Sequence, residues 1–412
     1  MPKVLRIINR LNLGGPTYNA AYLTKYLEPE FETLLVAGQK LESEGCSKYI
    51  LDDLGIRPII IPEMKREINL FDDYKAYIKI KKLIREFEPD VVHTHASKAG
   101  FIGRLAAINS NVPVIVHTFH GHVFHSYFGK LKTSFFKFIE RYLASKTTKI
   151  ITLSEKQEQE ICDEHKICSK DKSNIVPLGF DLNRFSENVD DKRISFRQQY
   201  NIKDDEMAIG IIGRLVPVKN HTLFIDSLIE TKKKTAKKLK SFIIGDGEDK
   251  ESIINYAKMN GLSVSYQEEK NENAELVFTS WITEIDTALA GLDVIAMTSN
   301  NEGTPVSLIE AQAAGKPIVT TNVGGVENIV IPNRSAFVCP PHDPNCFSDC
   351  LVKLTNPELR QSMGASGKNF GVEKFHFSRL TSDIRQLYYN LLNPVENRFN
   401  SAMPNPLSRS KI

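Results

Sequence analysis

The feature that most constrains the fold is an alternation of short, apolar, β-branched segments with longer helical ones. Seven short segments near the start of the chain are predicted as strands: Val4–Ile8, Thr33–Ala37, Arg57–Ile61, Asp90–His95, Val114–Phe119, Lys149–Ser154 and Asn174–Leu178. Strands that alternate with helices indicate βαβ units. The sequence therefore predicts a mostly parallel, doubly wound sheet.

The same alternation of predicted strands and helices begins again after a polar, charge-rich stretch near Ser186–Asp205. The second series of predicted strands is Met207–Gly213, Ser241–Gly245, Leu276–Ser280, Asp293–Ser299, Pro317–Thr321 and Ala336–Cys339. We expect two Rossmann-like α/β domains, residues 1–185 and 186–375, with a ligand-binding cleft between them. Residues 394–412 are rich in Pro, Ser and Asn without apolar periodicity, and we predict a disordered tail there.

Composition agrees with this division and excludes several classes of protein. A chain of 412 residues exceeds what one hydrophobic core usually supports. The net charge of +3 is too small to indicate a nucleic-acid-binding protein. Six cysteines without a C-x-x-C pair favour a reducing compartment. With no secretory apolar run at the start and no long apolar segment later, the sequence predicts a cytoplasmic protein.

The segment 298–330, TSNNEGTPVSLIEAQAAGKPIVTTNVGGVENIV, carries the most specific chemistry. A strand is expected to end near Ser299, and Pro305 stands where a helix can begin. The free backbone N–H groups of residues 303–307 then form an anion site. Glu302 precedes this turn and Glu310 follows it about two helical turns later.

Two carboxylates beside an anion site have two explanations. A nucleotide-sugar satisfies both features, because its phosphates suit the amides and its hydroxyl groups suit the carboxylates. Alternatively, both glutamates are solvated residues favoured by the helix dipole. The spacing alone leaves these two interpretations about equal.

This segment resembles the E-x7-E signature of the family 4 retaining glycosyltransferases of the GT-B fold, including the AGKPIV and GG-V stretches after it. The resemblance extends from Leu13-Gly14-Gly15 to the last helix before Pro394. It implies that Glu302 contacts the donor sugar and Glu310 the ribose. The further donor-binding positions that it implies are Gly303, Thr304 and Pro305 beside the sugar, and the amides of Val306 and Ser307 at the diphosphate.

The segment 213–220, GRLVPVKN, follows the first predicted strand of the second domain. Arg214 and Lys219 can both reach one diphosphate from that strand end, although a solvated basic loop has the same composition. The segment resembles the family's GRL-x-x-x-KN motif, in which these residues neutralise the leaving diphosphate. Such cations replace a divalent metal, so we expect no metal and no other cofactor.

Six of the ten histidines lie between His93 and His125. A metal cluster is one explanation, but few carboxylates or thiols are near, and strand alternation gives His93 and His95 a structural role. The segment TFHG resembles a family motif whose histidine lines the cleft near the reacting sugar. His120 is therefore the candidate in the first domain, either to position the donor or to pass a proton on.

Gly14-Gly15 separates the first strand from the first helix, and Gly15 is a candidate for close approach by the donor. A dinucleotide-binding enzyme would instead carry G-x-G-x-x-G here and an acidic residue after the second strand. The sequence has NLGGPTYN and then TLLVAGQ, so this class is excluded.

His342, Cys346 and Cys350 follow one another at intervals of four residues. On one helix this spacing forms a stripe of possible metal ligands. Family members carry small apolar residues at the two cysteine positions, so core packing is the favoured interpretation.

Residues 91–150 hold eight Lys and Arg against one acid, Glu140. Within them, the predicted helix 130–146 mixes aromatic and basic residues. Such a helix can bind an anionic membrane surface, or it can pack its aromatic side chains on the sheet. The sequence leaves these alternatives about equal.

Together these features predict a metal-independent hexosyltransferase-type enzyme that moves a sugar with retention from a nucleoside-diphosphate sugar to a hydroxyl acceptor. By resemblance, the acceptor is lipid-linked or a glycan, the setting is polysaccharide or glycolipid synthesis, and residues 376–393 form a helix returning to the first domain. The expected location is the cytoplasm, peripheral at the inner membrane face, with no nucleic-acid partner. A sugar-nucleotide epimerase and a non-catalytic sugar-nucleotide-binding protein are the alternatives.

Overall fold

The chain forms two α/β units in a computed structural model. The structure describes residues 1–11, 14–39, 48–65, 67–120, 130–266, 269 and 271–393. One unit consists of Met1–Phe180 together with the segment that starts at Phe377, and the other consists of Asp181–His376. The predicted tail, 394–412, lies outside the described residues.

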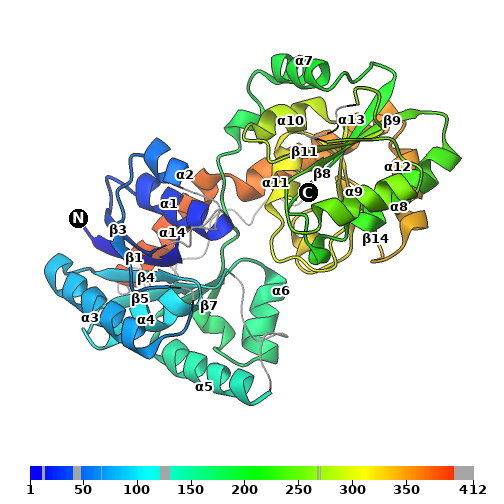
Figure 1. Cartoon of the computed structure of the whole chain (residues 1–412). Helices are drawn as coiled ribbons and strands as arrows, with labels where there is room; N and C mark the ends of the chain where they lie inside the picture. Colours follow the sequence, from blue (N-terminus) through cyan, green and yellow to red (C-terminus); the bar gives the residue numbers. More distant parts are fainter. Residues whose placement is uncertain are drawn as a thin grey trace, which may run out of the picture. The chain divides into compact units, whose positions relative to one another are not determined.

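The first unit is built on a seven-stranded parallel sheet of order β3-β2-β1-β4-β5-β6-β7 (Figure 1). Its strands are β1 (Lys3–Arg10), β2 (Glu32–Gly38), β3 (Ile59–Ile61), β4 (Val91–His95), β5 (Val114–Thr118), β6 (Lys149–Thr152) and β7 (Ser173–Ile175). Its helices are α1 (Gly15–Tyr26), α2 (Lys48–Asp53), α3 (Leu70–Phe87), α4 (Ser97–Ile108), α5 (Lys130–Lys146), α6 (Glu155–Glu158), η1 (Gln159–Glu164), η2 (Lys170–Lys172) and α14 (Phe377–Leu392).

Alternate side chains of β1 cover the two faces of this sheet. Leu5 and Ile7 join a core formed with α3 and α4, whereas Val4 joins a core formed with α1 and α14. Because successive strand residues point to opposite faces, these helices form two layers around the sheet. Figure 1 shows α3, α4 and α5 on one side of it and α1 and α14 on the other.

The second unit contains another seven-stranded parallel sheet, of order β10-β11-β9-β8-β12-β13-β14. Its strands are β8 (Glu206–Ile212), β9 (Lys238–Ile244), β10 (Val264–Ser265), β11 (Leu276–Ser280), β12 (Val294–Met297), β13 (Ile318–Thr321) and β14 (Ala336–Cys339). Its helices are η3 (Asn183–Phe185), α7 (Val189–Gln199), η4 (Pro217–Lys219), α8 (His221–Lys234), α9 (Lys250–Met259), α10 (Ile285–Gly291), α11 (Val306–Ala313), η5 (Val326–Asn328), α12 (Pro344–Lys353) and α13 (Pro357–Phe375).

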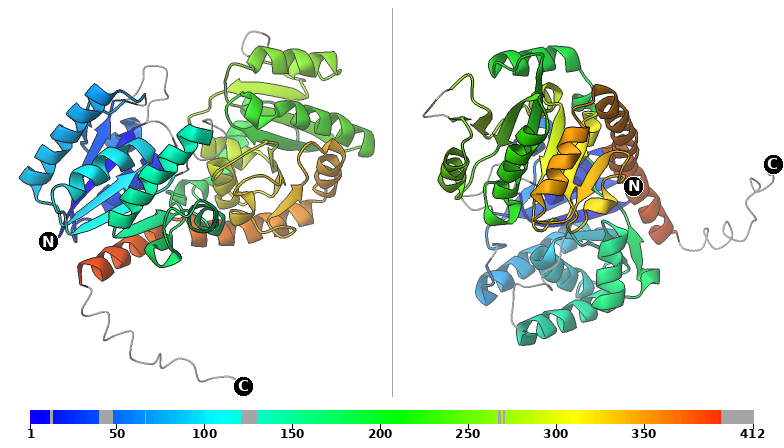
Figure 2. Two further views of the ribbon diagram at one scale, coloured as in Figure 1. Left: turned by 90° about the horizontal axis from the view of Figure 1, so that it is seen from below. Right: turned by 90° about the vertical axis from the view of Figure 1, so that its right-hand side faces the viewer.

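The second sheet is also covered on both faces, as Figure 2 shows. Ile209 and Ile211 of β8 pack with α8, α9 and α12 in one core. On the opposite face, a side chain on Gly210 would collide with Leu292, just after α10. Phe196 of α7 covers the neighbouring strand through its ring contact with Phe242 of β9.

Both sheets have the strand order of a doubly wound dinucleotide-type fold, with the order reversing beside β1 and beside β8. The predicted two-domain α/β architecture is therefore confirmed, and every predicted strand is present. The sequence missed β10, since a two-residue strand carries no periodicity. In such sheets ligands bind at the carboxyl ends of the strands where the order reverses.

Among the helices that the structure describes, none combines the length and the apolar character needed to cross a bilayer.

Candidate functional site

The loops that follow β8 and β12 meet at the reversal point of the second sheet. β8 and β12 are neighbouring parallel strands, so both loops leave from the same edge. The backbone N–H of Asn300 donates to the carbonyl of Val218 over 2.8 Å, and the hydroxyl of Thr298 donates to the carbonyl of Lys219 over 3.1 Å. These bonds join two segments that lie about eighty residues apart in the sequence.

Lys219 and Glu302 form an ion pair across these loops. The hydroxyl of Ser299 donates to the same carboxylate oxygen of Glu302 over 2.7 Å. The two charged side chains are 24% and 12% exposed, so the pair is largely sheltered from water but open on one side. The fold thus brings together a cation and a carboxylate that the sequence placed in separate motifs.

Two consecutive glycines, Gly324 and Gly325, pack against the backbone of the loop that carries Glu302. Gly324 has a φ of +55°, and a side chain there would lie 1.7 Å from the carbonyl oxygen of Glu302. Gly325 donates its N–H to that same oxygen over 3.3 Å. Glycine adopts the left-handed conformation of Gly324 without strain, and it alone permits this approach of backbone to backbone. A side chain on Gly325 would lie 2.3 Å from the carbonyl oxygen of Gly303, so both positions require glycine.

The amino end of α11 presents the backbone N–H groups of Val306 and Ser307. Pro305 is the N-cap residue of α11, not its first helical residue as the sequence predicted, and no side chain caps the helix. Because proline lacks an N–H and the first turn of a helix has no internal partners, these amides are available to an anion. Beside them, a side chain added to Gly303 would meet nothing within 4 Å, so the turn borders open space.

Glu310 lies on α11 beside Arg184, at 3.7 Å from its guanidinium. Burial raises the pKa of Glu310 to about 7, although Arg184 opposes that shift. Its side chain is still 20% exposed, so a ligand hydroxyl can reach it. Sequence reasoning missed Arg184, because it lies in η3, far along the chain from both recognised motifs.

Arg214 follows β8 at the same edge, and its side chain is exposed. Backbone bonds of its two neighbours fix its position: Gly213 donates to Ile244 and Leu215 donates to Asp246. The side chain of Lys219 passes beside Gly213, where an added Cβ would lie in ordinary contact with it, at 3.4 Å from Cε.

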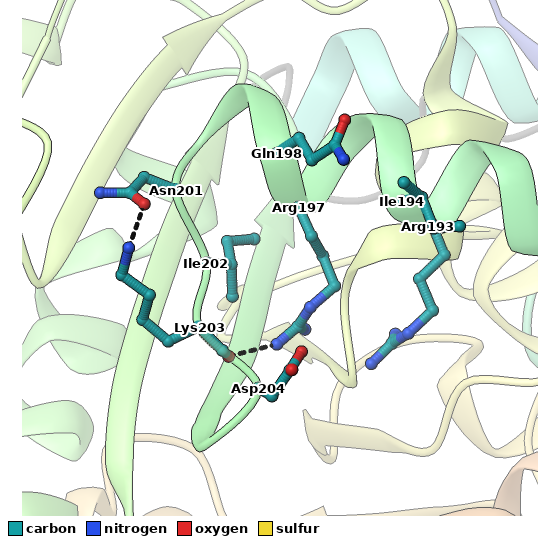
Figure 3. A pocket seen from close by; sticks show the side chains of 8 residues that line it. All are labelled: Arg193, Ile194, Arg197, Gln198, Asn201, Ile202, Lys203 and Asp204. Carbon is teal, nitrogen blue, oxygen red and sulfur yellow. Dashed lines mark hydrogen bonds between the residues drawn. The ribbon is translucent and has the colours of Figure 1, made fainter.

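The second unit has a hollow of about 510 Å³ that lies away from the Lys219–Glu302 pair (Figure 3). It is lined by α7 and the following loop, including Arg193 and Arg197. Both arginines form ion pairs with Asp293, which precedes β12, at 3.0 and 3.3 Å. The hollow therefore lies near the amino end of β12, whereas the Lys219–Glu302 pair lies beyond the carboxyl end of that strand.

In the first unit, buried polar side chains surround Arg6 of β1. Its Nη1 donates to Nδ1 of His93 over 3.0 Å and to Nε2 of His95 over 3.4 Å. His95 Nδ1 lies 2.9 Å from Nε2 of His120. The hydroxyl of Tyr388, on α14, lies 2.6 Å from Nδ1 of His93. The predicted structural role of His93 and His95 agrees with these contacts.

The proton positions along this chain follow from Arg6, because a guanidinium donates and never accepts. Nε2 of His95 must accept, so Nδ1 of His95 carries the proton and donates to Nε2 of His120. Nδ1 of His120 then carries a proton as well, and this buried atom has no partner among the described residues. Burial lowers the pKa of His120 to about 3, which keeps the ring neutral at ordinary pH.

Gly15 opens α1, and a side chain there would lie 2.9 Å from Leu178. Gly14, the N-cap, has a φ of +154°. Gly15 thus allows α1 to pack closely against Leu178. Leu13, His122 and His125 lie outside the described residues.

The predicted stripe of His342, Cys346 and Cys350 does not exist on one helix. α12 begins at Pro344, capped by Asp343, and His342 stands before it, exposed and with a φ of +62°. Instead, Cys346 and Cys350 lie close to Cys339, the last residue of β14. The three sulfur atoms lie within 4.8 Å of one another.

Comparisons with known proteins cover nearly the whole chain. Residues 14–184 match the family model "Glycosyltransferase Family 4", and residues 192–370 match "Glycosyl transferases group 1". An Escherichia coli UDP-Gal:alpha-D-GlcNAc-diphosphoundecaprenol alpha-1,3-galactosyltransferase is 30% identical over 354 residues, 85% of this chain and 88% of that protein. The Staphylococcus aureus capsular polysaccharide biosynthesis glycosyltransferase CapM is 27% identical, over 82% of this chain and 86% of that protein.

Among solved structures, that of Anabaena HepE in complex with UDP and glucose has a TM-score of 0.76. Its sequence is 16% identical, and the match covers 95% of this chain and all of that one (100%). At this identity the likeness establishes the GT-B fold alone.

Proposed function

The chain belongs to the family 4 glycosyltransferases, and from that membership we propose that it transfers a hexose from a nucleoside-diphosphate sugar to a lipid-linked glycan acceptor. The observation that carries this proposal is the Lys219–Glu302 pair, held beside the free amides of α11. A cation and helix amides suit a diphosphate, while two carboxylates suit sugar hydroxyls. The names of the relatives support a UDP-linked donor and a diphospholipid-linked acceptor.

In this proposal, donor binding breaks the Lys219–Glu302 ion pair, and each of the two side chains then contacts a part of the donor. The diphosphate takes Lys219, together with Arg214 and the amides of Val306 and Ser307. Glu302, released from the lysine, accepts from the sugar hydroxyls beside Gly303, Thr304 and Pro305. Glu310 accepts from the ribose hydroxyls, held by Arg184.

The chemistry proposed for this site is charge stabilisation of the leaving diphosphate. Lys219, Arg214 and the helix amides lower the barrier by balancing the charge that grows as the glycosidic bond breaks. These groups do the work of a metal ion, so we propose metal-independent transfer. We also propose retention of configuration, with the departing diphosphate accepting the proton of the acceptor hydroxyl.

His120 acts in this proposal as a neutral hydrogen-bond donor that positions the sugar. A ring with a pKa near 3 stays neutral at ordinary pH, with one N–H and no second proton to give to a substrate. Its Nδ1–H is instead oriented by the chain from Arg6 through His95. This favours the positioning role over the proton-transfer role.

Incubation of the protein with UDP-galactose, with and without undecaprenyl-diphosphate-linked N-acetylglucosamine, tests the function. We expect UDP release that depends on the acceptor, in the presence of a metal chelator. A new sugar-nucleotide epimer formed without acceptor would instead identify an epimerase. Binding of several UDP-sugars without turnover on a panel of lipid-linked acceptors would identify a binding protein.

Substitution of the ion pair separates binding from turnover. In Glu302→Gln, Lys219 has no ion pair to break before it contacts the diphosphate, so UDP should bind as tightly as in the wild type or tighter. The value of kcat should fall about 100-fold or more, because the carboxylate that accepts from the sugar is lost. Lys219→Ala should weaken UDP binding itself. Lys233→Ala, which removes an exposed lysine of α8, is the control. Equal losses of UDP affinity in Glu302→Gln and Lys219→Ala would contradict the exchange of partners.

Donor binding should depend on pH through Glu310. Because its pKa is raised to about 7, the carboxylate is increasingly protonated below that pH and accepts ribose hydroxyls less well. The affinity for UDP-galactose, whose diphosphate does not titrate in this range, should fall about tenfold for each pH unit below 7 and level off above it. Calorimetry from pH 5.5 to 8.5 measures this. Glu310→Gln should flatten the profile, and an unchanged slope in that variant would refute the assignment.

His95 should act as a positioning residue for His120. In His95→Leu nothing fixes the proton on His120, so kcat should fall about 10- to 100-fold with little change in the KM for donor. His95→Gln can still accept from Arg6 and donate to His120, and it should recover much of the rate. If the leucine and glutamine variants are equally impaired, the proton chain plays no part.

We also propose that α5 contacts an anionic membrane that carries the acceptor. Phe135, Phe138 and Tyr142 lie on one side of this helix and are 61%, 67% and 50% exposed. Their exposure opposes the alternative in which these aromatic side chains pack on the sheet. Lys146 is exposed on the same helix, in a segment with a strong excess of basic residues.

Co-sedimentation with anionic and neutral vesicles tests this contact. We expect binding to anionic vesicles alone, weakened about tenfold in Phe135→Ser/Phe138→Ser. Ile194→Ser, which removes an exposed apolar side chain of the second unit, should bind like the wild type. Equal binding to both kinds of vesicle would contradict the proposal.

A further inference from the structure

We propose that Cys339, Cys346 and Cys350 form a binding site for a thiophilic d10 cation, with Zn²⁺ as its expected occupant. The three sulfur atoms come from two elements, the end of β14 and the first turns of α12. Cys346 and Cys350 project from the same side of the helix because they are four residues apart. The short turn between β14 and α12 adds Cys339 to them.

The spacing of the sulfur atoms suits a single bound ion. The Sγ atoms of Cys339 and Cys350 are 3.6 Å apart, and all three lie within 4.8 Å of one another. In a tetrahedral thiolate site with bonds of about 2.3 Å, neighbouring sulfur atoms are about 3.8 Å apart. Small rotations of the side chains therefore close the set around one ion.

Two of the three thiols are buried, and the third is partly accessible. Cys339 and Cys350 are buried in the core formed by the sheet with α8 and α12, whereas Cys346 is only half-buried and leaves an entry path. Burial raises the pKa of the Cys346 thiol, so the bound cation itself must displace its proton. Binding of a divalent ion by three thiols releases three protons, and water completes the tetrahedron.

This site adjoins the scaffold of the donor site. The carbonyl of Cys339 accepts from the N–H of Asn322 over 2.7 Å. Asn322 is two residues before Gly324, which lies against the backbone of Glu302. A bound ion therefore braces the edge of the sheet that supports the candidate active site, without contact to the donor.

Metal titration of the reduced, chelator-treated full chain tests the proposal, with Co²⁺ as a spectroscopic probe and Zn²⁺ as its competitor. We expect one Co²⁺ per chain with thiolate charge-transfer bands, displacement by Zn²⁺, and a Zn²⁺-dependent rise in Tm. Mg²⁺ should have none of these effects.

Two variants make the result specific. Cys346→Ser, at the most accessible of the three positions, should weaken Co²⁺ binding about 100-fold or more and abolish the Tm rise. Cys162→Ala/Cys168→Ala removes a pair of thiols with the same sulfur separation of 3.6 Å in the first unit, and it should bind like the wild type. Absence of charge-transfer bands in the folded wild type, or their survival in Cys346→Ser, would overturn the proposal. Both results are independent of glycosyl transfer.

Discussion

A lysine and a glutamate face each other at the point where the strand order of the second sheet reverses, and the account of this protein depends on their pairing. Lys219 reaches this point because η4 follows β8 closely, and Glu302 reaches it from the loop after β12. A backbone bond and a bond from the hydroxyl of Thr298 join the two loops, and Gly324 packs closely against the backbone of Glu302. The charges are therefore positioned by the parallel sheet itself.

This arrangement explains how one site can hold a cation and carboxylates without either cancelling the other. Without a ligand, the lysine and Glu302 satisfy each other, so neither charge is left buried and unpaired. A diphosphate and a sugar together replace both halves of the pair. A ligand that offers only one of these groups leaves the other charge without a partner, which favours a complete nucleotide-sugar over its fragments.

The sequence predicted the fold well because its signals are local. Strands such as Val91–His95 and the turn at Gly303 are short segments whose residue types determine their conformation. Contacts between distant segments were not accessible in this way. Arg184 beside Glu310, Cys339 beside Cys346, and Tyr388 beside His93 all depend on which strands become neighbours. Family resemblance supplied the expected roles of Glu302 and Glu310, and physical spacing alone left them undecided.

The most direct test of the central claim is a crystal structure of the protein with UDP-galactose bound. We predict the diphosphate within hydrogen-bond distance of the amides of Val306 and Ser307, with the ammonium of Lys219 turned from Glu302 toward it and the ribose on Glu310. A diphosphate bound away from α11, with the Lys219–Glu302 pair intact, would contradict the account.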